Sequence, residues 1–165
     1  MTVDARTVPD TDYESRVRAS FARQAVMRTI GAELTRVTPG IVEIEMPHSA
    51  ELTQQHGFLH AGVISTALDS ACGYAAFSLL PENASVLTIE FKVNLLAPGK
   101  GERFLFRGAV TKPGKTIIVA DGQAYAFGSN GEAIQLPPNI FHEKRLDQIR
   151  NHEITRDEKA KNTNG

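Results

Sequence analysis

The stretch from about His60 to Leu80 limits the possible folds more than any other part of this 165-residue chain. It contains no proline, it ends just before Pro81, and it is long enough for a helix rather than a strand. Small residues recur along it, and the large apolar residues between them leave no polar stripe. A helix that is apolar on nearly all sides is buried on nearly all sides, and small residues let other backbones approach closely. The segment therefore predicts a central helix enclosed by other elements.

The sequence on both sides of this segment alternates with a period of two, which is typical of strands. The alternation is clearest over residues 86–96, and we expect this strand to serve as core and interface. One face carries Leu87, Ile89, Phe91, Val93 and Leu95. Pro39-Gly40 separates two extended runs within 32–49 and predicts a hairpin. Further strands are expected at the following ranges: 102–111, 116–129 and 132–137.

Residues 15–31 carry apolar side chains at helical spacing and predict one short amphipathic helix that stops at Gly31. A long helix among antiparallel strands is the α+β pattern. We expect a single domain over 16–141, a loose leader over 1–15, and a charged tail over 142–165 with at most a short helix.

The composition excludes several classes of protein. A formal net charge of −1 does not provide a broad basic face for nucleic acid, and no apolar run approaches the length that spans a membrane. A single cysteine cannot form an intrachain disulfide, and the first residues lack the pattern of a secretory signal. A soluble cytoplasmic protein is the expectation.

Asp69 is the residue of the predicted helix that packing does not explain. A buried carboxylate needs a partner or a raised pKa, so Asp69 either faces water, pairs across a subunit contact, or performs chemistry. Amides at a helix start around Ala61 can polarise a carbonyl oxygen. Asp69 lies ~12 Å along the axis from Ala61, so one chain cannot easily bring the two together. An Asp69 from a second subunit could, which predicts a dimer with sites at its interface.

The stretch QQHGFLHAGVISTALDSACGYAA, residues 54–76, resembles the signature of hotdog-fold acyl-CoA thioesterases of the phenylacetate-degradation (PaaI-like) type. That signature is usually a His-Gly-Gly triplet followed on the same helix by Asp or Glu. The resemblance covers about residues 20–137 and includes VLTIEFKVNLLAPG and the later hairpin. It implies an antiparallel sheet wrapped around one long helix, an acyl-CoA substrate that is hydrolysed to free acid and coenzyme A, and a homodimer or homotetramer.

The resemblance also implies roles for individual residues. Asp69 matches the catalytic carboxylate, which acts as general base toward water or as nucleophile toward the thioester. Gln54 matches the residue that orients the water, and Thr88 is similar in position to a hydroxyl residue that assists it. The amide of Ala61 matches the donor to the thioester carbonyl, and His60 the histidine that shapes the helix start. The chain departs from the pattern at Ala61, where glycine is usual and where the extra methyl affects the approach of the substrate.

Three residues are candidates for binding coenzyme A. Gly62 belongs to the same helix start, and Lys112 and Lys115 flank a Pro-Gly turn where two ammonium groups suit phosphates. The alternative for the lysines is a solvated turn. No metal cluster or redox motif is visible in the sequence, so no cofactor is expected.

Other interpretations remain beside the thioesterase. Cys72, three residues after Asp69, invites comparison with a Cys-His-Asp hydrolase, but no activating histidine is recognisable and a small core residue is the better interpretation. A non-catalytic acyl-CoA-binding protein on the hotdog fold would keep the pocket, whereas a hotdog dehydratase would need a different Asp and His arrangement. The identity of the acyl group stays open.

Overall fold

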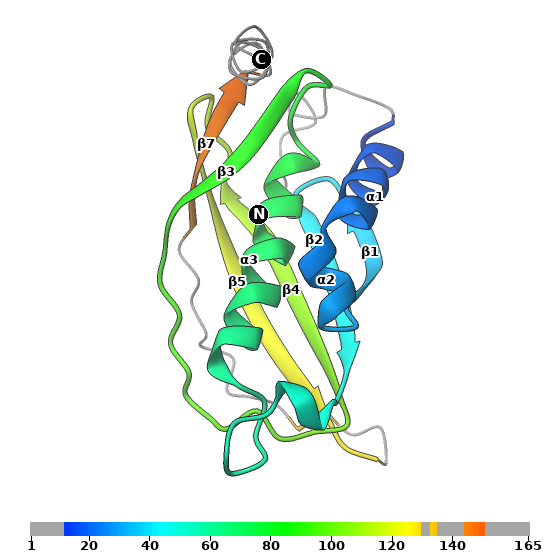
Figure 1. Ribbon diagram of the computed structural model, residues 1–165. Coiled ribbons are helices and arrows are strands. Elements are labelled where there is room, and N and C mark those ends of the chain that lie inside the picture. Colours follow the sequence, from blue (N-terminus) through cyan, green and yellow to red (C-terminus); the bar gives the residue numbers. More distant parts are fainter. Residues whose placement is uncertain (1–11, 130–132, 135–143, 151–165) are drawn as a thin grey trace, which may run out of the picture.

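A computed structural model of the chain describes residues 12–129, 133–134 and 144–150 (Figure 1). Two helices, α1 (Tyr13–Arg23) and α2 (Ala25–Thr29), precede the hairpin of β1 (Glu33–Thr38) and β2 (Ile41–Pro47). A short 3-10 helix, η2 (Ala50–Leu52), leads into the long helix α3 (Ala61–Phe77). The remaining elements are strands: β3 (Ala84–Phe91), β4 (Arg103–Lys112), β5 (Ile117–Phe127), β6 (Ala133–Ile134) and β7 (Lys144–Arg150).

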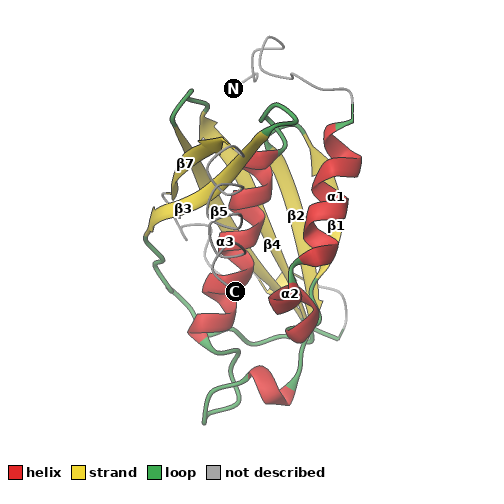
Figure 2. Ribbon diagram, turned by 45° about the horizontal axis from the view of Figure 1, so that its top comes forward, coloured by secondary structure: helices red, strands yellow, loops and turns green. Residues whose placement is uncertain are grey.

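The strands form one antiparallel sheet in the order β1-β2-β4-β5-β7-β3, with β6 paired to β5. The helix α3 lies along one face of this sheet, and α1 and α2 lie beside it (Figure 2). Ile44 pairs with Phe106, and Phe106 pairs with Ala124, so the alternate residues of three strands face the helix together. The α+β prediction and the expected hairpin around Pro39-Gly40 are confirmed.

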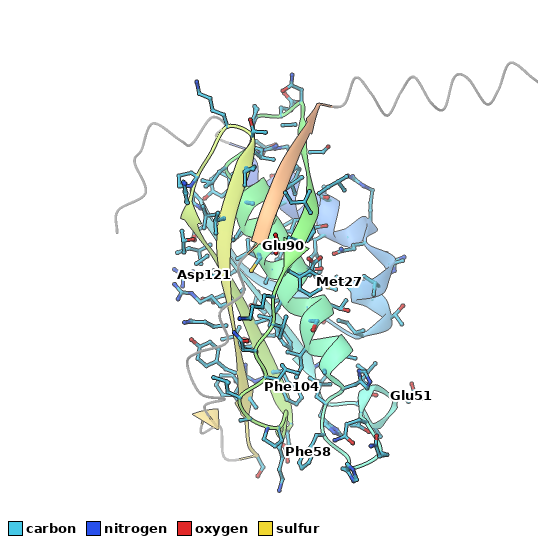
Figure 3. The ribbon with its side chains drawn as sticks, turned by 90° about the vertical axis from the view of Figure 1, so that its left-hand side faces the viewer. Met27, Glu51, Phe58, Glu90, Phe104 and Asp121 are labelled. Atoms are coloured by element: carbon cyan, nitrogen blue, oxygen red, sulfur yellow. The ribbon has the colours of Figure 1, made fainter. Side chains whose placement is uncertain are left out.

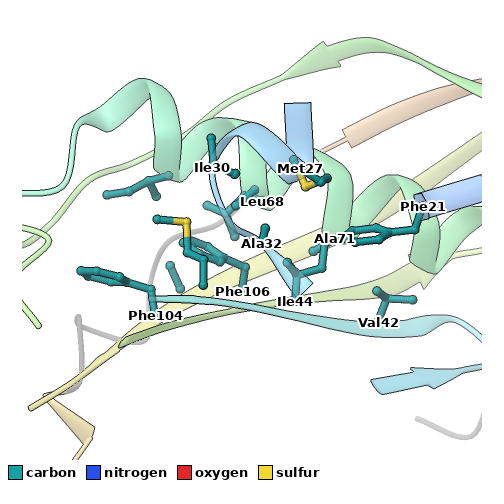
Figure 4. Close-up of a cluster of buried hydrophobic side chains, with 14 of the residues drawn as sticks. Phe21, Met27, Ile30, Ala32, Val42, Ile44, Leu68, Ala71, Phe104 and Phe106 are labelled. Carbon is teal, nitrogen blue, oxygen red and sulfur yellow. The ribbon is translucent and has the colours of Figure 1, made fainter. Parts of the chain in front are cut away.

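The core lies between α3 and the middle of the sheet. Ile44, Leu68, Ala71 and Phe106 are almost completely buried there (Figure 4). Gly108 of β4 lies so close to α3 that a Cβ atom at this position would overlap the backbone of Ala71. The small residues of α3 therefore allow the helix to touch the sheet backbone, as the sequence predicts.

The prediction of one helix over 15–31 is wrong in one respect. The helix is broken at Gln24. Gln24 has an extended ψ of 97°, and its side-chain oxygen accepts a hydrogen bond from Ser70 of α3 at 3.3 Å. In one straight helix Phe21 and Met27 would lie about 120° apart around the axis. The break turns both side chains into the core, where both are buried.

The alternating strand differs from the expectation of a core element. β3 ends at Phe91, and Leu87, Ile89 and Phe91 are 55%, 52% and 46% exposed. β3 is the last strand of the sheet, and these three side chains stay about half exposed in one chain. We call Leu87, Ile89 and Phe91 the β3 apolar row. The helix α3 is likewise enclosed only in part, since Val63, Tyr74 and Phe77 are half-buried.

The charged tail also differs from the expected short helix. Residues Lys144–Arg150 form β7, which pairs with β5 on one side and β3 on the other. Without β7, the facing edges of β5 and β3 would each have unpaired backbone N–H and C=O groups. Pairing with β7 gives these groups, and those of β7 itself, hydrogen-bond partners. Residues 151–165, most of the expected leader and most of the strand expected over 132–137 lie outside the described residues.

Candidate active site

The start of α3 is shaped by His60, which is the N-cap residue of the helix. Its Nδ1 atom accepts a hydrogen bond from the Gly62 N–H at 2.9 Å. A Cβ atom at Gly62 would lie 3.1 Å from that nitrogen, so glycine leaves room for the imidazole. Ala61 is the first residue of the helix and is exposed, and its N–H has no acceptor within the helix. The expected amide donor is therefore available at the surface.

The loop before α3 holds Gln54 close to this helix start. The Gln54 side-chain oxygen accepts from the His56 N–H, and Gly57 has a φ of 79° that suits glycine. Gln54 and Ala61 both line a cavity of about 410 Å³, which Leu95 and Leu96 also line. We call it the helix-start cavity. Phe58, a further lining residue, lies beside the start of α3 in Figure 3.

Asp69 lies farther along α3 and is half-buried. The Thr88 hydroxyl of β3 donates a hydrogen bond to Asp69 Oδ1 at 3.0 Å. Both residues line a second cavity of about 580 Å³ between α1, α3 and β3, which we call the Asp69 cavity. In Figure 3, Glu90 of β3, two residues after Thr88, lies beside a later part of α3, whereas Phe58 lies beside the start of α3.

The structure thus divides the predicted site residues of one chain into separate groups. Asp69 and Thr88 meet in one cavity, whereas Gln54 and Ala61 line the other. His60 and Gly62 flank Ala61 at the helix start and hydrogen-bond with each other. Within one chain the carboxylate therefore does not share a cavity with the amide of Ala61.

Lys112 and Lys115 lie away from both groups. They are exposed at the turn between β4 and β5. This turn lies where α3 ends, because Val110 donates to Gly40, and Gly40 donates to Ser78, which follows the helix directly. In one chain the two lysines are therefore at the opposite end of α3 from Ala61.

The wall that α1 contributes to the Asp69 cavity was not predicted from the sequence. Ser20 and Arg23 of α1 line it together with Tyr74 of α3. Burial raises the pKa of the Tyr74 phenol above its usual value of 10.0, while a hydrogen bond with Ser20 and the charge of Arg23 oppose that shift. The signal that could have revealed this wall is the spacing of Arg16, Ser20 and Arg23, which puts three polar residues on one side of α1.

Cys72 is fully buried, as expected of a core residue. No group of three His, Cys, Asp or Glu side chains in the described ranges is arranged to hold a metal ion. None of the helices within those ranges combines the length and apolar character needed to cross a membrane.

The match to known proteins covers this same region. The model of the thioesterase superfamily matches residues 56–131, from the loop before α3 past the end of β5. A crystal structure of a thioesterase family protein from Silicibacter pomeroyi is 55% identical, with a TM-score of 0.79 over 84% of this chain and 98% of that chain. The chain belongs to the thioesterase superfamily. This membership confirms the hotdog fold and makes the chain a thioester hydrolase.

Other relatives of this thioesterase are more distant. SSO1253 of Saccharolobus solfataricus, whose name assigns it provisionally to the esterases, is 32% identical over 70% of this chain and 77% of that protein. The medium/long-chain acyl-CoA thioesterase YigI of Escherichia coli is 28% identical over 56% of this chain and 70% of that protein. The PaaI protein of E. coli shares the fold, with a TM-score of 0.67 and 17% identity over 86% of this chain and 95% of that chain.

Proposed function

We propose that this thioesterase hydrolyses an acyl-CoA thioester at a site built by two subunits of a homodimer or homotetramer. Asp69 and Thr88 come from one subunit, and Gln54 and the amide of Ala61 come from the other. The observation that carries the proposal is the separation of these two groups into different cavities of one chain. The β3 apolar row supports it, because an edge strand with exposed apolar side chains is a surface on which a second copy can pack.

The chemistry follows from the two groups. The Ala61 N–H at the positive end of α3 stabilises the oxyanion that forms on the thioester carbonyl. Asp69 takes a proton from water as general base, or attacks the carbonyl carbon as nucleophile, while Gln54 positions the water. With Asp69 as general base, the proton that it took passes to the sulfur as the carbon–sulfur bond breaks, and the free acid and coenzyme A leave. With Asp69 as nucleophile, the bond breaks to leave a mixed anhydride on Asp69 and a coenzyme A thiolate that takes a proton from water, and the water positioned by Gln54 then hydrolyses the anhydride. The Thr88 hydrogen bond holds the Asp69 carboxylate in one orientation.

The name of YigI supports coenzyme A as the leaving group, since that relative is an acyl-CoA thioesterase. The ammonium groups of Lys112 and Lys115 are proposed to meet its phosphates from a neighbouring subunit, because they lie far from the Ala61 of their own chain. Gly62 is proposed to let the substrate approach the helix start. We place the reaction in a reducing compartment such as the cytoplasm, in line with the single cysteine.

The first test is thiol release from phenylacetyl, benzoyl and straight-chain acyl-CoA esters by the wild type and by Asp69→Asn. We expect the wild type to hydrolyse at least one ester and the variant to lose nearly all of kcat while its melting temperature stays close to wild type. Binding of the esters with no hydrolysis by either protein would instead favour the non-catalytic acyl-CoA-binding alternative.

A second test asks whether the site is shared between subunits. Ala61→Pro removes the proposed donor at the first helical position, where proline is tolerated, and His60 already has φ −64° and ψ 137°, which suit a residue before proline. Asp69→Asn and Ala61→Pro subunits, unfolded together and refolded, should regain about a quarter of wild-type activity, because half of the dimers then contain one intact site. A mixture that stays inactive while forming mixed dimers would show that each subunit uses its own Asp69 together with its own Ala61 amide.

A further inference from the structure

We propose that the Asp69 cavity selects acyl groups that end in a carboxylate over those of equal length that end in a methyl group. This inference rests on the proposed function, in which the thioester lies next to Asp69 and the acyl group enters the same cavity. It concerns the far wall of the cavity, formed by α1 and the later part of α3, which has no part in the hydrolytic step.

The far wall is polar where an aliphatic chain would need apolar contacts. Arg16, Ser20 and Arg23 lie at i, i+4 and i+7 of α1, so they share the side of that helix that lines the cavity. The apolar side of the same helix, with Val17 and Phe21, is buried in the core. Because the apolar side of α1 packs in the core, its polar side faces the cavity.

Tyr74 is the central donor of this wall. It is half-buried, and its hydroxyl lies 3.4 Å from the Ser20 hydroxyl. Edge-on contacts with Phe21 and Phe77, at centroid distances of 5.6 and 6.3 Å, hold the ring in place. Burial raises the pKa of this phenol, so Tyr74 keeps its proton and remains a donor at neutral pH. A fixed donor of this kind favours an acceptor on the ligand.

Two guanidinium groups add positive charge around Tyr74. Arg16 donates to the carbonyl oxygens of Leu80 and Pro81 at 2.7 and 3.1 Å, and its guanidinium stacks 4.9 Å above the centre of Phe77. These contacts fix one cation at the end of the cavity. Arg23 is exposed and lines the cavity with Tyr74, and its charge only partly opposes the rise that burial causes in the pKa of the phenol. Glu82 is the acidic group on this side of the cavity.

The distance from Asp69 fits a short acyl group. Tyr74 is five residues beyond Asp69, ~7.5 Å along the helix axis. A methyl terminus that filled this space would take the Tyr74 and Ser20 hydroxyls out of water and leave them only the hydrogen bond between them, so one of the two O–H donors would lose its acceptor, which is costly. A carboxylate would accept from those hydroxyls and from Arg23, and hydrogen bonds to a charged group are the stronger ones. The cavity therefore matches a dicarboxylic acid that is joined to coenzyme A at one end.

The experiment compares kcat/KM for three esters of equal chain length: adipyl-CoA, ω-hydroxyhexanoyl-CoA and hexanoyl-CoA. We expect the wild type to prefer adipyl-CoA. Tyr74→Phe and Arg23→Gln should each lower kcat/KM for adipyl-CoA by about ten- to hundredfold and leave hexanoyl-CoA within about threefold. The matched controls are Tyr125→Phe, on a strand outside this cavity, and Arg18→Gln, on α1 but paired with Glu14. Neither control should change the preference.

A preference of the wild type for hexanoyl-CoA or for the hydroxyl ester would overturn the inference while leaving thioester hydrolysis intact. An equal loss for all three esters in Tyr74→Phe would also overturn it, because that result indicates a purely structural role. Calorimetric titration of Asp69→Asn with the same esters separates this inference from the proposed function. If no ester is hydrolysed by the wild type, tighter binding of adipyl-CoA still supports the inference, and equal or weaker binding rejects it.

Discussion

Asp69 and, through the resemblance, Thr88 were named as site residues from the sequence, but the hydrogen bond between them was not predicted. An acid inside an apolar helix is visible in the sequence, but Thr88 is 19 residues away and only the fold brings its hydroxyl within 3.0 Å of the carboxylate. His60 was expected to shape the helix start, and its imidazole caps α3. Tyr74 had no signal of its own, because a tyrosine among alanines on a buried helix resembles a core residue.

Ala61→Pro tests the amide donor alone. The backbone N–H disappears but the helix start is preserved, so kcat should fall by about a hundred- to a thousandfold with little change in KM. Steady-state kinetics on the preferred ester and far-UV circular dichroism measure the two effects. The control is Ala61→Gly, which keeps the N–H and gives the helix start the His-Gly-Gly triplet of the signature that residues 54–76 resemble. A variant with proline that retains wild-type kcat would remove Ala61 from the mechanism.

The raised pKa of Tyr74 also predicts how the stability of the fold depends on pH. The folded state holds the phenolic proton to a higher pH than the unfolded state, because burial raises the pKa of Tyr74 above 10.0. The resulting contribution to stability is complete below pH ~10 and is lost as the pH rises through the folded pKa. The free energy of unfolding, measured by urea titration on either side of this pH, should therefore fall more steeply for wild type than for Tyr74→Phe. Tyr125→Phe, which leaves Tyr74 in place, should keep the wild-type slope.

At the scale of elements, residue spacing predicted whether a segment is a helix or a strand better than it predicted what that segment packs against. Prolines and glycines located the hairpin turn and the end of α3 well. The break at Gln24 was not predicted, because local spacing is compatible with one helix and only the core requires Phe21 and Met27 on the same side. The strand β3 was recognised by its alternation, but alternation does not say whether its apolar face meets the core or an open edge.

Gly108→Ala tests the contact between β4 and α3. A methyl group at this position overlaps backbone atoms of Ala71, which cannot move aside as a side chain could. We expect the free energy of unfolding to fall by about 3 kcal/mol or more, at or above the upper end for overpacked cores. Chemical denaturation measures it. Ala109→Ser, the next residue along the strand on the opposite face, should stay within about 0.5 kcal/mol of wild type. A small effect of Gly108→Ala would mean that the helix is not held against the sheet at this point.

At the scale of the whole molecule, a single chain leaves two partly apolar surfaces exposed to solvent. The β3 apolar row is exposed, and α3 is only partly enclosed. The two groups of site residues are also apart. A second copy that packs along β3 and α3 would cover the apolar surface and bring the groups together, so assembly and activity should be lost together.

Ile89→Lys tests this coupling. The side chain is 52% exposed on β3, so a lysine is tolerated in a monomer but is costly inside an interface. Sedimentation should show a shift toward monomer, and thioester hydrolysis should fall in proportion, although Asp69 and Thr88 are unchanged. Val26→Lys places the same charge on an apolar side chain that is 41% exposed on α2, and it should leave both properties unchanged. Full activity from a monomeric Ile89→Lys protein would contradict the shared site.

The sequence by itself determined the local features: the long apolar helix, the hairpin, the period of the strands, the acid at Asp69 and the helix start at His60-Ala61-Gly62. Each of these depends on residues close together in the chain, where spacing and backbone preference act directly. Only the tertiary structure decided that Thr88 meets Asp69, that α1 and Tyr74 form the far wall of the Asp69 cavity, that β7 lies between β5 and β3, and that the apolar face of β3 is left open. These features depend on contacts between distant segments, which packing selects and local spacing does not.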